Sequence, residues 1–179
     1  MNILAICGSL RKKSTNMGLL RYAQANAPEG SKITIADLSA VPFYNADISE
    51  KPAAVVTLLE QIGAADALIF GCPEYNYSIA PALKNALDWA SREPDNALLS
   101  GKAVALMGAG GGMGTSRAQY HLRQVCVFLN LHPLNKPEVF VNAFAGTFDA
   151  DGNLTDEKIQ GNVKAQLVAL VDWVKQLKR

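Results

Sequence analysis

A segment of mixed aromatic and polar residues, 73–78, directly follows an apolar run at residues 67–72. The apolar run is typical of a buried strand in a parallel sheet, and ligands of such sheets bind at the carboxyl ends of the strands. Flat rings beside short polar groups suit a planar ligand with a polar edge. The candidate contacts with such a ring are Pro73, Glu74, Tyr75 and Asn76. Taken alone, tyrosines after a strand also fit an ordinary core or interface contact.

A second polar loop, residues 8–16, lies between a first strand pattern and a helical pattern. Unpaired N–H groups and the helix dipole attract an anion at a helix N-terminus. Hydroxyls, an amide and a guanidinium complete a candidate phosphate site: Ser9, Arg11, Ser14, Thr15 and Asn16. The same residue types also make an ordinary turn with a helix cap. The loop is not a Walker A loop, because that pattern requires glycine where Lys13 stands.

A third loop, residues 108–116, is rich in glycine and also follows a strand pattern. Glycines let the backbone approach a ligand closely and turn its N–H groups inward. The candidates for this contact are Gly108, Gly110 and Gly111. The dinucleotide fingerprint G-x-G-x-x-G is excluded, because Met113 and Thr115 stand where its last glycine is required. A flexible loop without a ligand is the alternative interpretation.

The elements that must position these loops alternate between strand and helix patterns. Strand patterns cover residues 3–7, 32–37, 67–71, 103–107 and 139–141. Helical patterns cover residues 17–26, 55–62, the segment from Pro81, 116–129 and 159–177. Thr15 and Thr155 are the expected caps of the first and the last helix. This alternation predicts one flavodoxin-like α/β domain over residues 1–179, with a five-stranded parallel sheet in the order 2-1-3-4-5 and helices on both faces. Right-handed crossovers then bring the three loops to one edge of the sheet.

One ligand that joins a phosphate to a planar ring would use all three loops, and flavin mononucleotide (FMN) fits best. No metal site is predicted, because His121 and His132 lack ligand spacing. The three cysteines, Cys7, Cys72 and Cys126, lie in apolar elements without a redox or metal spacing. They are therefore expected to be buried thiols in a reducing cytoplasm.

Composition narrows the range of partners. The 179 residues are 49% apolar and carry a formal charge of +1, which gives no reason to expect nucleic acid or an anionic membrane. The apolar amino terminus has no basic flank and is interpreted as a first strand rather than a signal peptide. No apolar run approaches the roughly 20 residues of a membrane span.

The helical pattern at residues 116–129 is apolar on two sides. One side would pack on the sheet and the other would pack on a second subunit. The first side consists of Leu122, Val125, Cys126 and Leu129, and the second of Tyr120, Val127 and Phe128. The pattern therefore predicts a homo-oligomer that forms through the helix around Arg117–Leu129.

With these segments in view, the chain resembles the NADPH-dependent FMN reductase family, and in particular its quinone, chromate and azo-dye reductases. Residues 8–16 are similar to the phosphate loop of the family, residues 73–78 followed by 83–89 to its flavin-ring motif, and residues 117–124 to its fourth helix. The resemblance implies FMN held by the three loops, NADPH or NADH as electron donor, a small-molecule electron acceptor, and a dimer or tetramer.

The resemblance also implies the chemistry, in which two electrons pass from NAD(P)H through one flavin to an acceptor. No side chain is predicted to act as catalytic acid or base. Arg11, Arg92 and Arg117 are candidates for contact with a 2′-phosphate of NADPH. Two alternatives stay open: a flavodoxin-like electron carrier, and a flavin- or nucleotide-binding regulatory module without turnover.

Overall fold

Short aliphatic runs form a parallel sheet at the centre of the molecule, because strands buried on both faces need apolar residues at successive positions. The computed structural model describes residues 1–178. Its main strands are β1 (Asn2–Cys7), β2 (Lys32–Ala36), β3 (Ala67–Gly71), β6 (Ala103–Gly110) and β8 (Val139–Asn142). The strand order β2-β1-β3-β6 agrees with the predicted order, and every pair in this sheet is parallel.

The fifth position of the sheet is shared by two strands, which the sequence did not predict. A short strand, β7 (His132–Pro133), pairs with the beginning of β6, and β8 pairs with its end. Two residues, one of them a proline without an N–H, show no apolar alternation that a pattern could detect. Because β8 pairs with Met107–Gly110, β6 also runs three residues beyond its predicted end.

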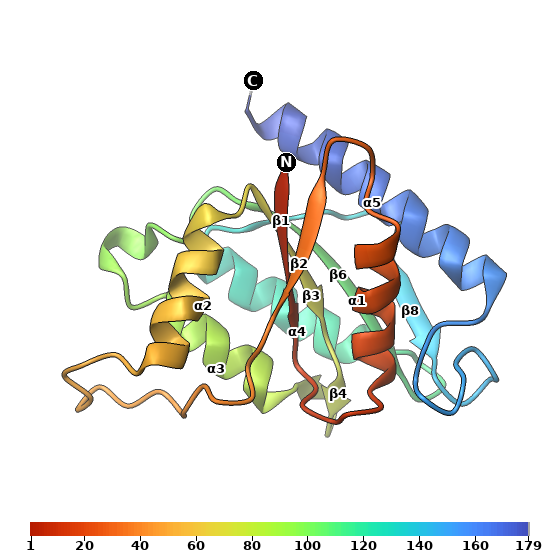
Figure 1. Cartoon of the computed structure of the whole chain (residues 1–179), viewed down its shortest axis with the longest axis horizontal. Coiled ribbons are helices and arrows are strands. Elements are labelled where there is room, and N and C mark those ends of the chain that lie inside the picture. The colour runs from red at the N-terminus through yellow and green to blue at the C-terminus, as the bar shows by residue number, and fades with distance from the viewer. Residues whose placement is uncertain (179) are drawn as a thin grey trace.

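Five helices cover the two faces of the sheet (Figure 1). They are α1 (Thr15–Ala25), α2 (Ala53–Ala64), α3 (Pro81–Ala90), α4 (Ser116–Phe128) and α5 (Glu157–Leu177), and a short 3-10 helix spans Pro94–Asn96. One hydrophobic cluster packs α2, α3 and α4 on the sheet, and a second packs α1 and α5 on the opposite face. The alternating side chains of β1 divide between the two clusters.

Both expected helix caps were wrong by one residue. Ser14 rather than Thr15 caps α1, and its hydroxyl accepts a hydrogen bond from the N–H of Met17 at 3.2 Å. Asp156 rather than Thr155 caps α5 with an equivalent bond at 2.9 Å. In each pair the residue that caps still has an extended backbone, which places its side chain over the first turn.

Helix α4 has one buried and one exposed apolar face, as its pattern predicted. Leu122 and Cys126 are fully buried against the sheet. On the other side, Tyr120, Val127 and Phe128 are 58%, 80% and 76% exposed. The three cysteines are all buried and free, and burial raises the pKa of Cys72 and Cys126 to about 12. Within residues 1–178, no helix has the length and apolar character that crossing a membrane requires.

Helix α1 packs closely against the loop that precedes α5. A Cβ atom on Gly18 would lie 1.8 Å from the carbonyl oxygen of Gly152, so only glycine fits this contact. Gly152 itself has a φ of +77°, a conformation that favours glycine. The contact fixes α1, and with it the loop that precedes α1, against the carboxyl-terminal part of the chain.

We expect Gly18→Ala to lower the free energy of unfolding by about 1–3 kcal/mol, because the added methyl group must displace backbone atoms. The matched control is Gly161→Ala in α5, where a Cβ meets no atom within 4 Å. That change is expected to raise stability by up to about 1 kcal/mol through helix propensity. Urea unfolding followed by circular dichroism measures both. Equal effects of the two changes would contradict the proposed packing constraint.

Candidate functional site

The three loops singled out in the sequence meet at one edge of the sheet, the lower edge in Figure 1. The strands end in register, since Cys7 pairs with Gly71 and Gly71 pairs with Met107. Two further hydrogen bonds carry this register into the loops, from the N–H of Gly8 to Gly71 at 2.9 Å and from the N–H of Cys72 to Met107 at 2.8 Å. The predicted convergence of the loops is therefore confirmed.

The loop after β1 offers a cation beside the N-terminus of α1. Ser9 and Ser14 are buried there, with 6% and 1% exposure, and the Ser14 hydroxyl is engaged as the helix cap. The guanidinium of Arg11 makes no hydrogen bond or ion pair with any of residues 1–178, whereas Lys13 pairs with Asp151 at 2.9 Å. An exposed cation next to unpaired helix N–H groups fits a phosphate.

Asn16 is placed at the site, but its side chain has a structural partner. Its amide nitrogen donates to the carbonyl of Ala109 at 2.8 Å, and its amide oxygen accepts from the N–H of Ala109 at 2.9 Å. Both polar atoms are thus used to tie α1 to the end of β6. The backbone N–H groups of Asn16 and the half-buried Thr15, in the first turn of α1, are the parts that can meet an anion.

The glycines at the end of β6 have different roles. A Cβ on Gly108 would lie 2.0 Å from the Thr115 hydroxyl, and a Cβ on Gly110 would lie 2.5 Å from the carbonyl oxygen of Gly114. Internal packing therefore requires both of these glycines. Gly111 is exposed and faces open space, so it is the candidate of the three that a ligand can approach most closely.

The loop after β3 forms a small hairpin that the sequence analysis missed. Strands β4 (Glu74–Tyr75) and β5 (Ser78–Ile79) pair in antiparallel fashion around the two residues Asn76 and Tyr77. These two residues have φ angles of 51° and 65°, as a two-residue turn of type I′ requires. Asparagine at the first turn position is the signal that could have revealed the hairpin. Tyrosine at the second is strained by about 1–2 kcal/mol.

An ion pair between a buried carboxylate and a half-exposed guanidinium holds this hairpin against α4. The Arg117 guanidinium contacts one oxygen of the Glu74 carboxylate at 2.5 and 2.7 Å, and the N–H of Ala118 donates to the other at 3.2 Å. The Glu74 side chain is only 6% exposed. The same guanidinium lies 3.6 Å from the centre of the Tyr77 ring. Both oxygens of the carboxylate are therefore engaged in packing the hairpin on the N-terminus of α4.

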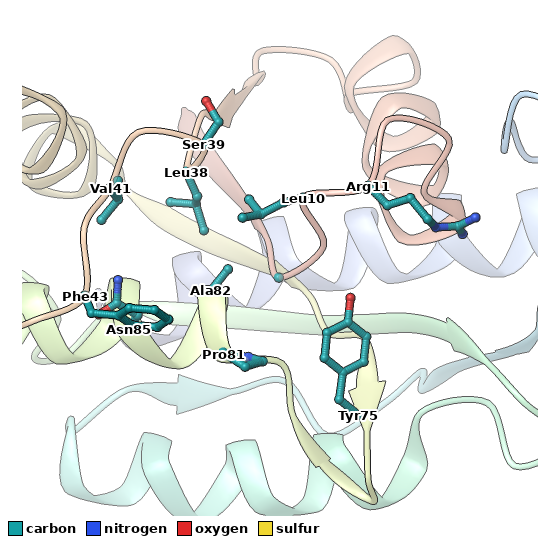
Figure 2. Close-up of a pocket in the computed structure, with 11 residues that line it drawn as sticks. Leu10, Arg11, Leu38, Ser39, Val41, Phe43, Tyr75, Pro81, Ala82 and Asn85 are labelled. Carbon is teal, nitrogen blue, oxygen red and sulfur yellow. The ribbon is translucent and has the colours of Figure 1, made fainter.

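Tyr75, in the hairpin, and Pro73, just before it, have different surroundings. Pro73 is buried against Gly8, where an added Cβ would lie 2.8 Å from the proline ring. Tyr75 is 48% exposed and extends along a cavity of about 350 Å³ (Figure 2). The other walls of this cavity come from the loop after β1, the loop after β2 and the start of α3: Gly8, Leu10, Arg11, Leu38, Ser39, Val41, Phe43, Pro81, Ala82 and Asn85. Most of the loop after β2 carried no recognisable motif and was missed.

The geometry suits binding and positioning more than acid–base chemistry. An unpaired cation and a helix N-terminus lie on one side, and an exposed ring, a turn amide and an open glycine backbone lie on the other. Glu74, the carboxylate of the ring loop, is already neutralised by Arg117. These residues fit a ligand that brings its own chemistry, as a flavin does.

Comparison with known proteins agrees with this geometry. The family model of the NADPH-dependent FMN reductases matches residues 1–146. An NAD(P)H-dependent FMN reductase of Pseudomonas aeruginosa is 50% identical over 99% of this chain and 97% of its own length. An NAD(P)H:quinone oxidoreductase of Solanum tuberosum is 46% identical over 99% of this chain and 95% of its own length.

Among solved structures, a flavoenzyme NAD(P)H:acceptor oxidoreductase of Paracoccus denitrificans superposes with a TM-score of 0.87. It is 31% identical, and the match covers 98% of this chain and 97% of that one. The resemblance expected from the two loop motifs is confirmed, and so is the fold class. The chain belongs to the NADPH-dependent FMN reductase family.

Proposed function

We propose that this chain is an FMN-dependent oxidoreductase that passes two electrons from NAD(P)H to a small-molecule acceptor such as a quinone, free flavin, azo dye or chromate. One observation carries the proposal. At the same edge of the sheet, the Arg11 cation lies without a partner beside the N-terminus of α1, and the loop after β3 exposes the ring of Tyr75. Family membership supports the same activity. Residues 1–179 would act as one domain with one flavin.

The phosphate would be held by the loop after β1. Arg11 would supply the charge, the hydroxyls of Ser9, Ser14 and Thr15 would donate hydrogen bonds, and Asn16 would contribute its backbone N–H while its side chain fixes the loop. Charge-assisted bonds of this kind are the strong ones. The negative end of the ligand is thus oriented toward α1, which leaves the ring to reach the hairpin.

The ring would lie between the hairpin and the end of β6. Pro73, Tyr75 and Asn76 would border it on one side and Gly111 on the other, with Gly108 and Gly110 shaping the strand end beneath. Glu74 would act indirectly, since it holds the turn through Arg117. When bound, FMN supplies the chemistry by accepting a hydride from NAD(P)H and passing two electrons on. The role of the chain is to orient the ring and leave one side of it accessible.

We further propose a homo-oligomer, a dimer or tetramer, that forms through α4. Its exposed face presents Tyr120, Val127 and Phe128, which is more apolar surface than one helix of a monomer usually leaves in water. Beside this face, a groove of about 560 Å³ lies between α3 and α4 and includes Leu87 and Val125. Three buried free thiols suit a reducing compartment, and the cytoplasm is our proposed location.

The visible spectrum of the purified protein tests the proposed function. We expect bands near about 375 and 450 nm that bleach when NADPH is added without oxygen, because a bound flavin would take up the hydride. A protein that stays colourless after FMN is added would contradict the flavin site. Bound flavin that neither NADPH nor NADH reduces would favour an electron carrier instead.

Replacement of Arg11 tests the phosphate loop. We expect Arg11→Ala to raise the Kd for FMN about 10- to 100-fold, because a hydrogen bond to a charged partner is lost. Riboflavin, which lacks the phosphate, should bind the variant and the parent protein equally. Lys175→Ala is the matched control, since Lys175 pairs with Asp172 on the exposed side of α5. Flavin fluorescence titration measures the Kd of the parent protein and both variants. An unchanged FMN affinity in Arg11→Ala would contradict the assignment of Arg11 to the phosphate.

Replacement of Arg117 tests the hairpin clamp. We expect Arg117→Ala to lower the free energy of unfolding by about 1–3 kcal/mol, because it leaves the buried Glu74 carboxylate without its cation. Lys84→Ala, which removes an exposed pair with Asp88, should cost only about 0.3–0.5 kcal/mol. The loosened turn should also weaken binding of riboflavin, in contrast to Arg11→Ala. A stability loss no larger than that of the Lys84 control would contradict the clamp.

A further inference from the structure

The apolar cavity beside Tyr75 shares only Arg11 and Tyr75 with the proposed flavin contacts, and the rest of its lining has no role in them. Phe43 and Tyr75 stand at two of its ends in Figure 2, with Leu10 and Leu38 on one side and Ala82 on the other. Its volume of about 350 Å³ is within the range of small-molecule sites. Figure 2 shows the Arg11 guanidinium, the one charged group in the lining, pointing away from it. The cavity thus offers apolar contacts without a counter-charge.

Phe43 is the unusual residue of this cavity, because its ring is 76% exposed. It lies in a stretch between β2 and α2 that has no regular secondary structure. An exposed phenylalanine in a long loop gains little for the stability of the chain itself. A single exposed ring is common on a protein surface, but this ring lines an apolar cavity, where a bound ligand can cover it.

The loop is nevertheless fixed on both sides of Phe43 by two residues of α3. The buried Asn85 donates to the carbonyl of Pro42 at 2.9 Å and accepts from the N–H of Tyr44 at 2.8 Å. Trp89 donates to the same carbonyl at 2.8 Å and packs edge-on against the Tyr44 ring at 5.1 Å. These contacts fix the backbone on both sides of Phe43 before any ligand arrives, which reduces the entropic cost of binding.

We propose that this cavity is the subsite for the electron acceptor, that Phe43 and Tyr75 contact an uncharged apolar ring of quinone type there, and that Asn85 positions Phe43. The proposal rests on the proposed function, and it deepens that function by selecting among the acceptor classes. Tyr75 belongs both to the ring loop and to the cavity wall, so an acceptor in the cavity lies beside the proposed flavin. An anionic acceptor such as chromate finds no positive charge directed into the cavity, because the Arg11 guanidinium points away from it.

The reaction balances without a further reagent. NAD(P)H gives up a hydride, which carries two electrons and one proton, and becomes NAD(P)+. The quinone takes up the two electrons, that proton and a second proton from water, and both of its C=O groups become O–H groups. The subsite has only to hold the ring next to the flavin, and it needs no acid of its own in the lining.

The decisive experiment compares Phe43→Ala with Phe144→Ala in the FMN-loaded protein. Phe144 is a matched control, since it is 86% exposed and lies outside the cavity. With menadione as acceptor, we expect Phe43→Ala to raise KM about fivefold and to change kcat by less than about twofold, because one aromatic contact is lost. The KM for ferricyanide, a charged acceptor, should rise much less, and Phe144→Ala should match the parent protein throughout.

Asn85→Asp tests the positioning role. The carboxylate can still accept from the N–H of Tyr44 but cannot donate to Pro42, so Phe43 is held less firmly. We expect Asn85→Asp to raise the menadione KM, as Phe43→Ala does. The midpoint of thermal unfolding is measured on the same protein. A lower midpoint with an unchanged menadione KM would show that Asn85 is structural only, and would overturn its positioning role.

Two other occupants of the cavity would give different results. If Phe43→Ala raised the Kd for FMN as much as the menadione KM, the cavity would hold the flavin ring itself, and the proposal would be wrong. If it raised only the KM for NADPH, the nicotinamide would be the occupant, which would overturn the proposal equally. Saturation-transfer NMR with menadione keeps this test separate from the proposed function, because it reads binding to the chain even if no flavin binds.

Discussion

Two hydrogen bonds between the Asn16 side chain and the backbone of Ala109 join the halves of the site. One half, the loop after β1, carries the cation and the helix N-terminus. The other half, the end of β6, carries the glycines. The bonds are buried, so loss of the amide would leave a backbone donor and acceptor unpaired at a cost of about 1–3 kcal/mol each. The Asn16 side chain therefore sets the distance between the loop after β1 and the end of β6. It can do so without any contact between its amide and the ligand.

The charged residues at this edge are divided between structure and binding. Glu74 and Arg117 neutralise each other and hold a turn in which Tyr77 has a φ of 65°. Strain of this kind persists only where the surroundings enforce it, and here the ion pair and the stacked guanidinium do so. Within residues 1–178 the Arg11 guanidinium has no protein partner, and its planar group can bond a phosphate through two N–H groups at once, which is why we assign it to the phosphate.

The sequence was sufficient to predict what depends on periodicity and chain order. Apolar runs, helical stripes and the alternation of the two predicted the strand order and brought three loops to one edge. The roles of single polar residues were less predictable, because they depend on contacts across the fold. Asn16 has the composition of a phosphate ligand, yet its partner is 93 residues away in the chain. Gly108 and Gly110 look like ligand-facing glycines, yet Thr115 and Gly114 occupy the space beside them.

Helix α3 shows how one element can serve both the core and the site. Its apolar side packs Leu83 and Leu87 against the sheet. Its polar residues Asn85 and Trp89 reach the loop after β2 and hold Pro42 and Tyr44 in place. The segment that resembles the flavin-ring motif of the family thus contacts a loop in which no motif was visible. A ligand subsite that is built from such a loop becomes visible only when the hydrogen bonds that fix it are known, since the loop itself has neither periodicity nor a recognisable pattern.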